Sequence, residues 1–325
     1  MRKRPEPGLL TVKTKGNGML SFSREIGKNR VLYLMMLPSL AFFAIFAYAP
    51  LVGLYYAFIN FNFIGGLFGS PFVGLKNFEF LFFGGAHAVV WRLTLNTVLY
   101  NLAFIFIGNG LQCFTAIILN DIRGRIYKRT TQSIMLLPYF VSFVIVGAIA
   151  YSIFNFELGS LNSVLKVFGI KPVNVYMLPS VWKYILVFFN TWKGLGYGTI
   201  IYLAAIMGID REMYEASELD GCNIFQQIRY ITLPLLKPTF IMLVLFSLGG
   251  IMRGQFDLFY QLIGNNGILF NATDILDTYI YRSLVINFNV STGTAAGLYQ
   301  SLFGFAAVMI VNAIIRKINK ENALF

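Results

Sequence analysis

The sequence predicts an all-α protein that crosses a membrane six times, and three observations lead to this fold class. Hydrophobic residues make up 57% of the 325 positions, charged residues only 12%, and mean hydropathy is +0.67. So little charge cannot cover a water-soluble surface of this size. Long charge-free runs recur along the chain, and about 20 apolar residues are enough to cross a bilayer.

Six spans are predicted from the gaps between charged residues. In chain order they cover residues 31–59, 93–120, 131–154, 181–207, 235–256 and 292–315. The fourth contains Lys183 and Lys193, and the fifth contains Arg253, so these two spans are exceptions to the charge-free rule. The chain is therefore expected to have a tail at 1–30, a transmembrane domain at 31–316 with a loop at 208–234, and a tail at 317–325.

The distribution of Lys and Arg predicts the orientation of the spans. Basic residues are retained on the cytoplasmic side of a membrane. With the amino terminus inside, the predicted cytoplasmic segments hold eighteen of the twenty-six Lys and Arg residues. Both termini and the loop at 208–234 are therefore predicted to lie in the cytoplasm. The basic start of the chain is expected to contact lipid headgroups and not nucleic acid.

A cleavable signal peptide is the alternative interpretation of the amino-terminal segment. Ala47-Tyr48-Ala49 resembles a cleavage site, but the apolar segment before it is too long and Pro50 would begin the mature chain. Cys113 falls within a predicted span and Cys222 within a cytoplasmic loop, so no disulfide is expected.

Motifs that carry catalytic chemistry are missing from the sequence. There is no G-x-x-x-x-G-K-[ST] loop for phosphate, and the single histidine, His87, cannot form a metal cluster or a relay with a second imidazole. We therefore expect no catalytic residues, no metal site and no enzyme activity in this chain. His87 is interpreted as a solvated residue of an external loop.

The stretch "EMYEASELDGCNIFQQIRYITLPLLKP", residues 212–238, differs from its apolar surroundings. Five of the fourteen acidic residues lie between Asp210 and Asp220. The pattern E-A-[A/S]-x3-G-x9-I-x-L-P predicts two short helices, at about 211–219 and 224–230, hinged at Gly221. The second helix is expected to end at Pro234, near the start of the fifth span.

This pattern resembles the EAA loop of membrane subunits of binding-protein-dependent ATP-binding-cassette importers. The phrases "FVGLKNFEFLF", "LTLNTVLYN", "MLLPYFVSFVIVGAIAYSIFN" and "YLAAIMGIDREMYEASELDG" resemble the oligosaccharide branch, especially permeases for alginate- or polygalacturonate-type substrates. The resemblance covers about residues 31–316. Ser217 departs from the third motif position by one small residue for another, and the short loop at 60–91 holds no large external domain.

The resemblance implies the type I importer permease fold, in the bacterial cytoplasmic membrane, and a set of partners. These are a second homologous permease subunit, two ATPase subunits that hold ATP and Mg, an external solute-binding protein and an oligosaccharide; this chain itself binds no cofactor. The acidic loop would dock in a cleft of the ATPase, with Glu215 meeting a basic residue and Ala216 and Ser217 seated against the surface. The residues expected to couple to the ATPase are Tyr214, Glu215, Ala216, Ser217, Asp220 and Gly221.

Two cations inside predicted spans point to the substrate. At about 1.5 Å per helical residue, Lys193 and Arg253 would lie at similar depth in the outer third of the membrane. They either face a polar pathway or snorkel and pair structurally, and Asp257 could neutralise only one of them. The first alternative favours an acidic over a neutral sugar. The expected pathway residues are Trp192, Lys193, Tyr197, Arg253, Asp257 and Tyr260.

Two other classes of function remain as alternatives. An ion-coupled secondary carrier for a small polar solute would need carboxylates within its spans, and Asp257 is the lone candidate. A membrane-bound enzyme would need several polar groups at one depth, and the sequence offers none. Dependence of uptake on a separate ATPase would distinguish the importer from the carrier.

Overall fold

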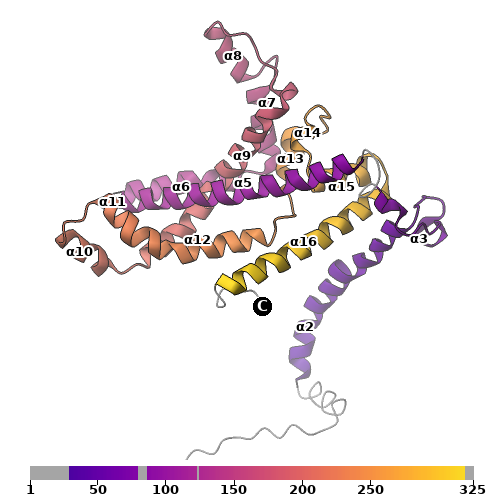
Figure 1. Cartoon of the computed structure of the whole chain (residues 1–325), viewed down its shortest axis with the longest axis horizontal. Helices are drawn as coiled ribbons and strands as arrows, with labels where there is room; N and C mark the ends of the chain where they lie inside the picture. Colours follow the sequence, from indigo (N-terminus) through magenta and orange to yellow (C-terminus); the bar gives the residue numbers. More distant parts are fainter. Residues whose placement is uncertain (1–28, 80–85, 123, 319–325) are drawn as a thin grey trace, which may run out of the picture. The chain divides into compact units, whose positions relative to one another are not determined.

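The computed structural model describes residues 29–79, 86–122 and 124–318 (Figure 1). The described residues are helical, with 3₁₀ and π segments labelled η and a single isolated β-bridge between Ile59 and Phe72. The elements are α2 (Arg30–Phe43), η1 (Ala44–Tyr48), η2 (Ala49–Phe58), α3 (Gly66–Gly69), η3 (Lys76–Phe78), α5 (Ala86–Asp121), α6 (Arg125–Phe140), α7 (Phe143–Phe154), α8 (Ser160–Val167), η4 (Val175–Met177), α9 (Pro179–Met207), α10 (Arg211–Leu219), α11 (Ile224–Gln227), η5 (Ile228–Thr232), α12 (Leu233–Leu248), α13 (Phe256–Ile263), α14 (Phe270–Thr273), α15 (Leu276–Tyr281), η6 (Arg282–Ile286) and α16 (Val290–Ile318).

The chain divides into two compact units, Met1–Tyr55 and Tyr56–Phe325. The first unit holds α2, η1 and the start of η2, and the second holds all later elements. The boundary falls within the first predicted span. Most of the predicted amino-terminal tail, most of the carboxyl-terminal tail and the side chain of His87 lie outside the described residues.

Three predicted spans are confirmed as long apolar helices. They correspond to the continuous helical stretch Arg30–Phe58, to α5 and to α16. By length and composition, four described helices could cross a membrane, or five if one bent pair counts as a single span. The predicted fourth span coincides with the single helix α9, but α9 is not among these four, and its Lys183 and Lys193 lower its hydropathy, so its crossing of the membrane stays a prediction. The count of six spans stays a prediction.

The predicted third span is not one straight helix, which corrects the expectation. It is divided into α6 and α7, which meet at an angle of 94°. Val141 and Ser142 between them have extended backbone, and the hydroxyl of Ser142 accepts a hydrogen bond from the amide of Ile145 at 3.4 Å. Ser142 therefore begins a new helix in a new direction.

The predicted fifth span also differs from the structure at both ends. No break occurs at Pro234, because α11, η5 and α12 form one continuous 25-residue helix, Ile224–Leu248. Pro234 lies beside a π turn, where the normal helical hydrogen bonding is already altered. At the other end α12 stops at Leu248, so Arg253 lies in a turn and the estimate of its depth from helical rise was wrong.

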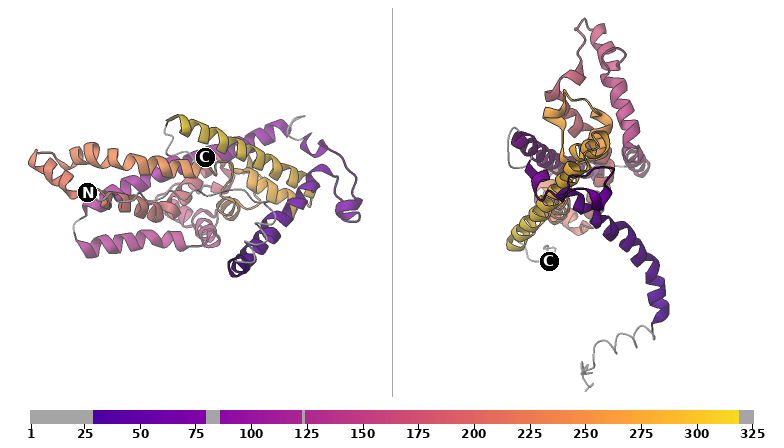
Figure 2. Two further views of the ribbon diagram at one scale, coloured as in Figure 1. Left: turned by 90° about the horizontal axis from the view of Figure 1, so that it is seen from below. Right: turned by 90° about the vertical axis from the view of Figure 1, so that its right-hand side faces the viewer.

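The core of the second unit lies where α9 crosses its neighbours. α9 packs mainly against α5 and α6, and α13 packs against α7 (Figure 2). Trp182 and Leu186 of α9 are fully buried there, together with Leu258 and Phe259 of α13. Gly196 permits the contact with α6, since a Cβ atom at this position would overlap the carbonyl oxygen of Met135.

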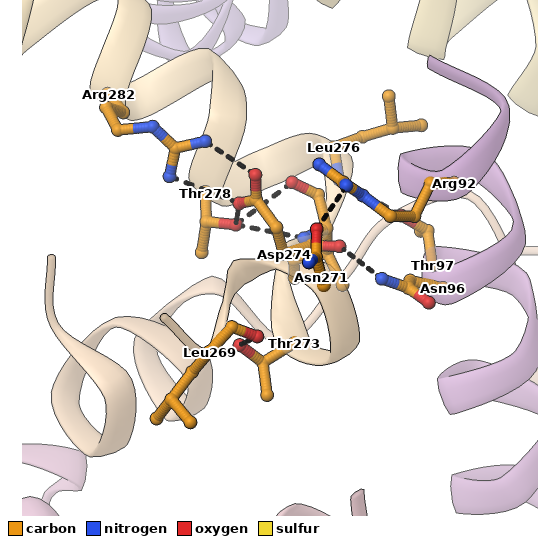
Figure 3. A network of polar contacts seen from close by, with 11 residues as sticks. Arg92, Asn96, Thr97, Leu269, Asn271, Thr273, Asp274, Leu276, Thr278 and Arg282 are labelled. Atoms are coloured by element: carbon orange, nitrogen blue, oxygen red, sulfur yellow. Dashed lines mark hydrogen bonds and ion pairs between the residues drawn. The ribbon is translucent and has the colours of Figure 1, made fainter. Parts of the chain in front are cut away.

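A buried polar network joins the segment after α13 to the start of α5 (Figure 3). The carboxylate of Asp274, only 3% exposed, pairs with Arg282 and accepts a hydrogen bond from the hydroxyl of Thr278 at 2.8 Å. Asn96 of α5 donates to the carbonyl of Asp274, and Thr97 accepts from the amide of Leu276 at 3.0 Å. The network fixes α15 against α5 because every buried charge in it has a partner.

Candidate functional site

The helix α10 is built by local capping, as its sequence suggests. Asp210 has extended backbone, and its carboxylate accepts a hydrogen bond from the amide of Glu212 at 3.2 Å. At the other end, Gly221 adopts φ = +77°. The amide of Gly221 donates to the carbonyl of Glu218, and the amide of Cys222 donates to the carbonyl of Ser217. Glycine suits this left-handed position because it has no Cβ atom.

The second loop helix begins immediately after the turn and continues into the fifth span. Asn223 and Gln226 form a capping box, in which each side chain bonds to the other residue's amide, at 2.9 and 2.7 Å. From there the helix runs without interruption to Leu248. A force applied to α11 therefore acts directly on α12.

Tyr214 and Ser217 connect the two loop helices from their inner faces. The hydroxyl of Tyr214 hydrogen-bonds to that of Thr232 at 2.9 Å, and Gln227 donates to the hydroxyl of Ser217 at 3.1 Å. Ser217, 9% exposed, thus faces its own chain and not the outer surface where we expected it. Tyr214 and Ser217 hold the shape of the loop.

The exposed surface of the loop, called its outer face below, combines acidic and apolar side chains. Glu215, Ala216 and Asp220 are exposed there, and Glu215 also borders the cavity described next. Leu219 and Phe225 are 90% and 78% exposed, and the sequence analysis had not singled them out. Exposed apolar residues beside charges are typical of a protein-binding surface. The signal that could have identified them is a bulky apolar residue in a polar loop.

A polar cavity of about 720 Å³ separates α10 from the ends of α5, α6 and α9. Its wall includes the side chains of Glu215 and Glu218 from α10, and Asp121 and Lys128 from α5 and α6. Figure 1 shows α10 at the end of the second unit that lies away from α15. The loop is therefore backed by a polar cavity.

Lys193 has its ammonium group bound to the backbone of the α6–α7 break. The Nζ atom donates to the carbonyls of Val141, Tyr139 and Pro138, at 2.6, 2.7 and 3.4 Å. It also lies 4.9 Å from the centre of the Phe143 ring. An ammonium group has three donors, and all three are engaged here. The structural alternative weighed for this lysine therefore fits its geometry.

Arg253 and Asp257 are arranged differently. Arg253 is exposed in the turn after α12, and within the described residues its guanidinium donates no hydrogen bond and forms no ion pair. Asp257 is exposed in the first turn of α13 and makes no ion pair in the same part of the chain. Within the described residues Asp257 therefore neutralises neither Arg253 nor Lys193, and Arg253 and Asp257 both remain exposed.

The three aromatic residues expected to line the pathway are engaged with other rings. Tyr197 stacks on Tyr139, with ring centres 4.8 Å apart and an interplanar angle of 10°. Tyr260 stacks on Phe256, and Trp192 packs edge-on against Phe189. Tyr197 is 51% exposed, so part of its surface remains available for a sugar ring.

The helical membrane unit and the two-helix loop together define a membrane transport permease. Residues 108–320 match the family described as "Binding-protein-dependent transport system inner membrane component". The chain belongs to this family. The first curated relative reported below is named a transport system permease protein.

Two curated relatives match almost the whole chain. One is the polygalacturonan/rhamnogalacturonan transport system permease protein YteP of Bacillus subtilis (strain 168), 30% identical over 90% of each chain. The other is Protein LplB of the same organism, 30% identical over 98% of each chain. The agreement extends across both units of the structure, so the similarity is not confined to the loop.

Solved structures agree with these relatives. A chain from a bacterial ABC transporter involved in the import of the acidic polysaccharide alginate matches with a TM-score of 0.81 and 29% identity, covering 92% of this chain and 99% of that one. A chain from a bacterial alginate ABC transporter in complex with an alginate pentasaccharide-bound periplasmic protein matches with a TM-score of 0.79, also at 29% identity, covering 91% and 98%. The fold is therefore that of a type I importer permease.

Proposed function

We propose that this chain is one permease subunit of an ATP-driven importer for an acidic oligosaccharide. The observation that carries the proposal is the match, over 92% of the chain, to a subunit of an importer of the acidic polysaccharide alginate. The exposed and unpaired guanidinium of Arg253 supports it, because a free guanidinium binds carboxylates in a two-pronged hydrogen-bonded geometry.

The importer would contain a second, homologous permease subunit, two ATPase subunits with ATP and Mg, and an external solute-binding protein. The solved relative with its periplasmic protein supports the last of these partners. This permease chain would bind no cofactor itself. It would supply half of the pathway and half of the contacts to the ATPase pair.

The two-helix loop would couple ATP hydrolysis to transport. Its outer face, with Glu215 and Ala216, would dock in the ATPase, while Asp220 and Gly221 set the bend. Tyr214 and Ser217 would transmit the motion, since both are bonded to the continuous helix Ile224–Leu248. Closure of the ATPases would then tilt this helix as a lever.

The substrate pathway would use the six side chains on α9, the turn after α12 and α13. Arg253 would supply the attractive charge and Asp257 a hydrogen-bond acceptor. Trp192, Tyr197 and Tyr260 would offer aromatic faces to the sugar rings. Lys193 would act on the pathway chiefly by fixing the α6–α7 break.

Uptake into vesicles that carry the complete complex tests the proposal. We expect ATP-dependent, vanadate-sensitive uptake of tetragalacturonate that exceeds uptake of the neutral maltotetraose. Uptake of maltotetraose in preference to tetragalacturonate would contradict the acidic substrate. Uptake that is insensitive to vanadate but abolished by collapsing the ion gradient would instead indicate an ion-coupled carrier.

Both termini would lie in the cytoplasm, on the same side as the loop. Accessibility tags at Gly169 and Asn271 should react with a membrane-impermeant reagent from outside, and tags after Arg125 or Phe325 should not. External labelling at Phe325 would reverse the assignment of every loop.

A further inference from the structure

The turn between α12 and α13 leaves backbone groups that no helix satisfies. α12 ends at Leu248 and α13 begins at Phe256, with Gly249 and Gly250 at the start of the gap. Backbone groups outside regular helices must be satisfied by other groups or by water. The hydrogen bonds of residues 251–254 therefore show how this turn is held.

Two side-chain amides satisfy the carbonyls of the turn. Asn101 of α5 donates to the carbonyls of Ile251 and Arg253, at 3.0 and 3.1 Å. Gln300 of α16 donates to the carbonyl of Met252 at 2.7 Å. Three successive carbonyls are thus bound by two helices that are distant in the sequence, and Asn101 is only 8% exposed.

A carboxylate completes the arrangement from a third helix. Asp277 of α15 accepts hydrogen bonds from the amide of Gly254 at 2.7 Å and from Gln300 at 3.0 Å. Burial raises the pKa of Asp277, and these hydrogen bonds together with the nearby charge of Arg253 act in the opposite direction. A Cβ atom at Gly254 would lie 2.7 Å from this carboxylate and would overlap the Ile275 side chain, so both side chains would have to shift to admit it.

The turn carries Arg253 with its backbone fixed and its head group free. Its carbonyl accepts from Asn101 and its amide donates to Gly250 at 2.8 Å, while the guanidinium stays unpaired within the described part of the chain. In contrast, the guanidinium of Arg282 pairs with Asp274, and the ammonium group of Lys193 donates to backbone carbonyls. A side chain presented in this way from an anchored backbone is suited to binding an anion.

We propose that Asn101, Asp277 and Gln300 are positioning residues that hold the turn at 251–254 so that the guanidinium of Arg253 meets the carboxylate of an acidic sugar. This inference rests on the proposed acidic substrate. The three side chains touch the turn and not the substrate. Their removal should therefore change the choice between substrates, through Arg253, and not merely the amount of folded protein.

The experiment measures ATP-driven uptake by the complete complex in vesicles, with tetragalacturonate and maltotetraose as the two probes. Asn101→Leu removes two of the three side-chain hydrogen bonds to the carbonyls of the turn, and Gln300→Met removes the third. The matched control is Asn109→Leu: Asn109 is also on α5, also 8% exposed, and also donates to the carbonyl four residues earlier, Ile105. We expect kcat/KM for tetragalacturonate to fall about tenfold relative to maltotetraose in the first two variants, as for the loss of one charge-assisted contact.

The control and a conservative change sharpen this result. Asn109→Leu should lower uptake of both probes by the same factor. Asp277→Asn keeps an acceptor for the amide of Gly254 and should retain the preference, whereas Asp277→Leu should lose it. Equal losses for both probes in Asn101→Leu and Gln300→Met would overturn the proposal, because that pattern indicates a structural role alone.

A double-mutant cycle tests whether the effect passes through Arg253. In an Arg253→Gln background the preference for tetragalacturonate should already be lost, and adding Gln300→Met should change the ratio less than twofold. A further tenfold change in this background would show that Gln300 acts independently of Arg253 and would overturn the proposal.

Chemical labelling separates this inference from the proposed function. In a chain with Cys113→Ala and Cys222→Ser, the rate at which a negatively charged methanethiosulfonate modifies Arg253→Cys reports the position of the turn without any sugar. Adding Gln300→Met should change this rate at least threefold, and Asn109→Leu should not. If the wild-type complex prefers maltotetraose, the proposed acidic substrate is wrong, but the labelling still decides whether Gln300 holds the turn. If Gln300→Met leaves the modification rate of Arg253→Cys unchanged, the positioning role is wrong even when tetragalacturonate is transported.

Discussion

The coupling loop, residues 208–234, and the turn at 251–254 both interrupt helices. They differ in how far apart in the sequence their hydrogen-bonded residues lie. In the loop, Asn223 bonds to Gln226 and Ser217 to Gln227, within ten residues. In the turn, Asn101 reaches across 150 residues to Ile251. The loop can therefore form its shape before the rest of the chain folds, whereas the turn exists only within the assembled bundle.

This difference separates two kinds of substitution. Changes on the outer face of the loop should alter binding to the ATPase with little effect on the stability of the chain. Changes around the turn or around the α6–α7 break should destabilise the bundle, because the backbone carbonyls there are bound by side chains from distant helices, and a substitution would remove these bonds. Four substitutions with matched controls, and one milder variant of Lys193, test the separation.

The largest effect is expected from Glu215→Lys in the coupling loop. Reversing one charge of a desolvated pair costs about 2 to 5 kcal/mol of binding energy, so the ATPase should no longer co-purify. The melting temperature of the isolated permease pair should stay unchanged because Glu215 is exposed. Glu157→Lys, also exposed but on the segment after α7, is the control. Normal co-purification and normal substrate-stimulated hydrolysis in Glu215→Lys would show that the docking role is wrong.

The next largest effect is expected from Lys193→Met at the α6–α7 break. It leaves the carbonyls of Tyr139 and Val141 without their short contacts to the ammonium group, a loss of about 2 to 3 kcal/mol of stability. Thermal unfolding of the purified complex measures this loss. Lys183→Met, on the same helix but exposed, should change the melting temperature little.

Lys193→Gln offers a milder test of the same contact. It should lower uptake of tetragalacturonate and maltotetraose in the same proportion, unlike Arg253→Gln. If Lys193→Gln lowered uptake of tetragalacturonate alone, we would conclude that Lys193 contacts the substrate.

A smaller effect is expected from Gly254→Ala in the turn. The added methyl group would overlap the Ile275 side chain and press on Asp277, which should cost about 1 to 3 kcal/mol by overpacking. Gly267→Ala is the matched control, because its Cβ atom would meet Phe270 at an ordinary 4.0 Å. Equal melting temperatures for the two variants would contradict the close approach at Gly254.

The smallest effect is expected from Gly221→Ala at the hinge of the coupling loop. Its backbone has φ = +77°, where a side chain costs about 1 to 2 kcal/mol, but nothing lies within 4 Å of the added atom. Local strain should therefore reduce coupling, measured as sugar transported per ATP hydrolysed, more than it lowers the melting temperature. Gly208→Ala, at a negative φ and with ordinary contacts, should leave both quantities near wild type.

The features that the sequence predicted are those whose physical cause is local. A charge-free run long enough to cross a bilayer identifies a span wherever its neighbours lie, and α5 and α16 agree with the predictions. The limits of α10, 211–219, also agree, since Asp210 and Gly221 supply its caps from within the loop. The prediction of a helix end at Pro234 was wrong, because the helix continues through this proline, which follows a π turn.

Tertiary contacts decided the remaining features. The 94° bend depends on Lys193, which lies more than fifty residues from the carbonyls that it binds. Beyond the end of α12 at Leu248, the turn is held by Asn101, Asp277 and Gln300, whose polar groups bind backbone groups of residues 251–254. The sequence shows a lysine and an arginine inside two apolar runs and gives them equal standing as substrate ligands. Only folding shows that Lys193 meets backbone carbonyls while Arg253 does not, because a charge is satisfied by the groups around it in space and not by its neighbours in the chain.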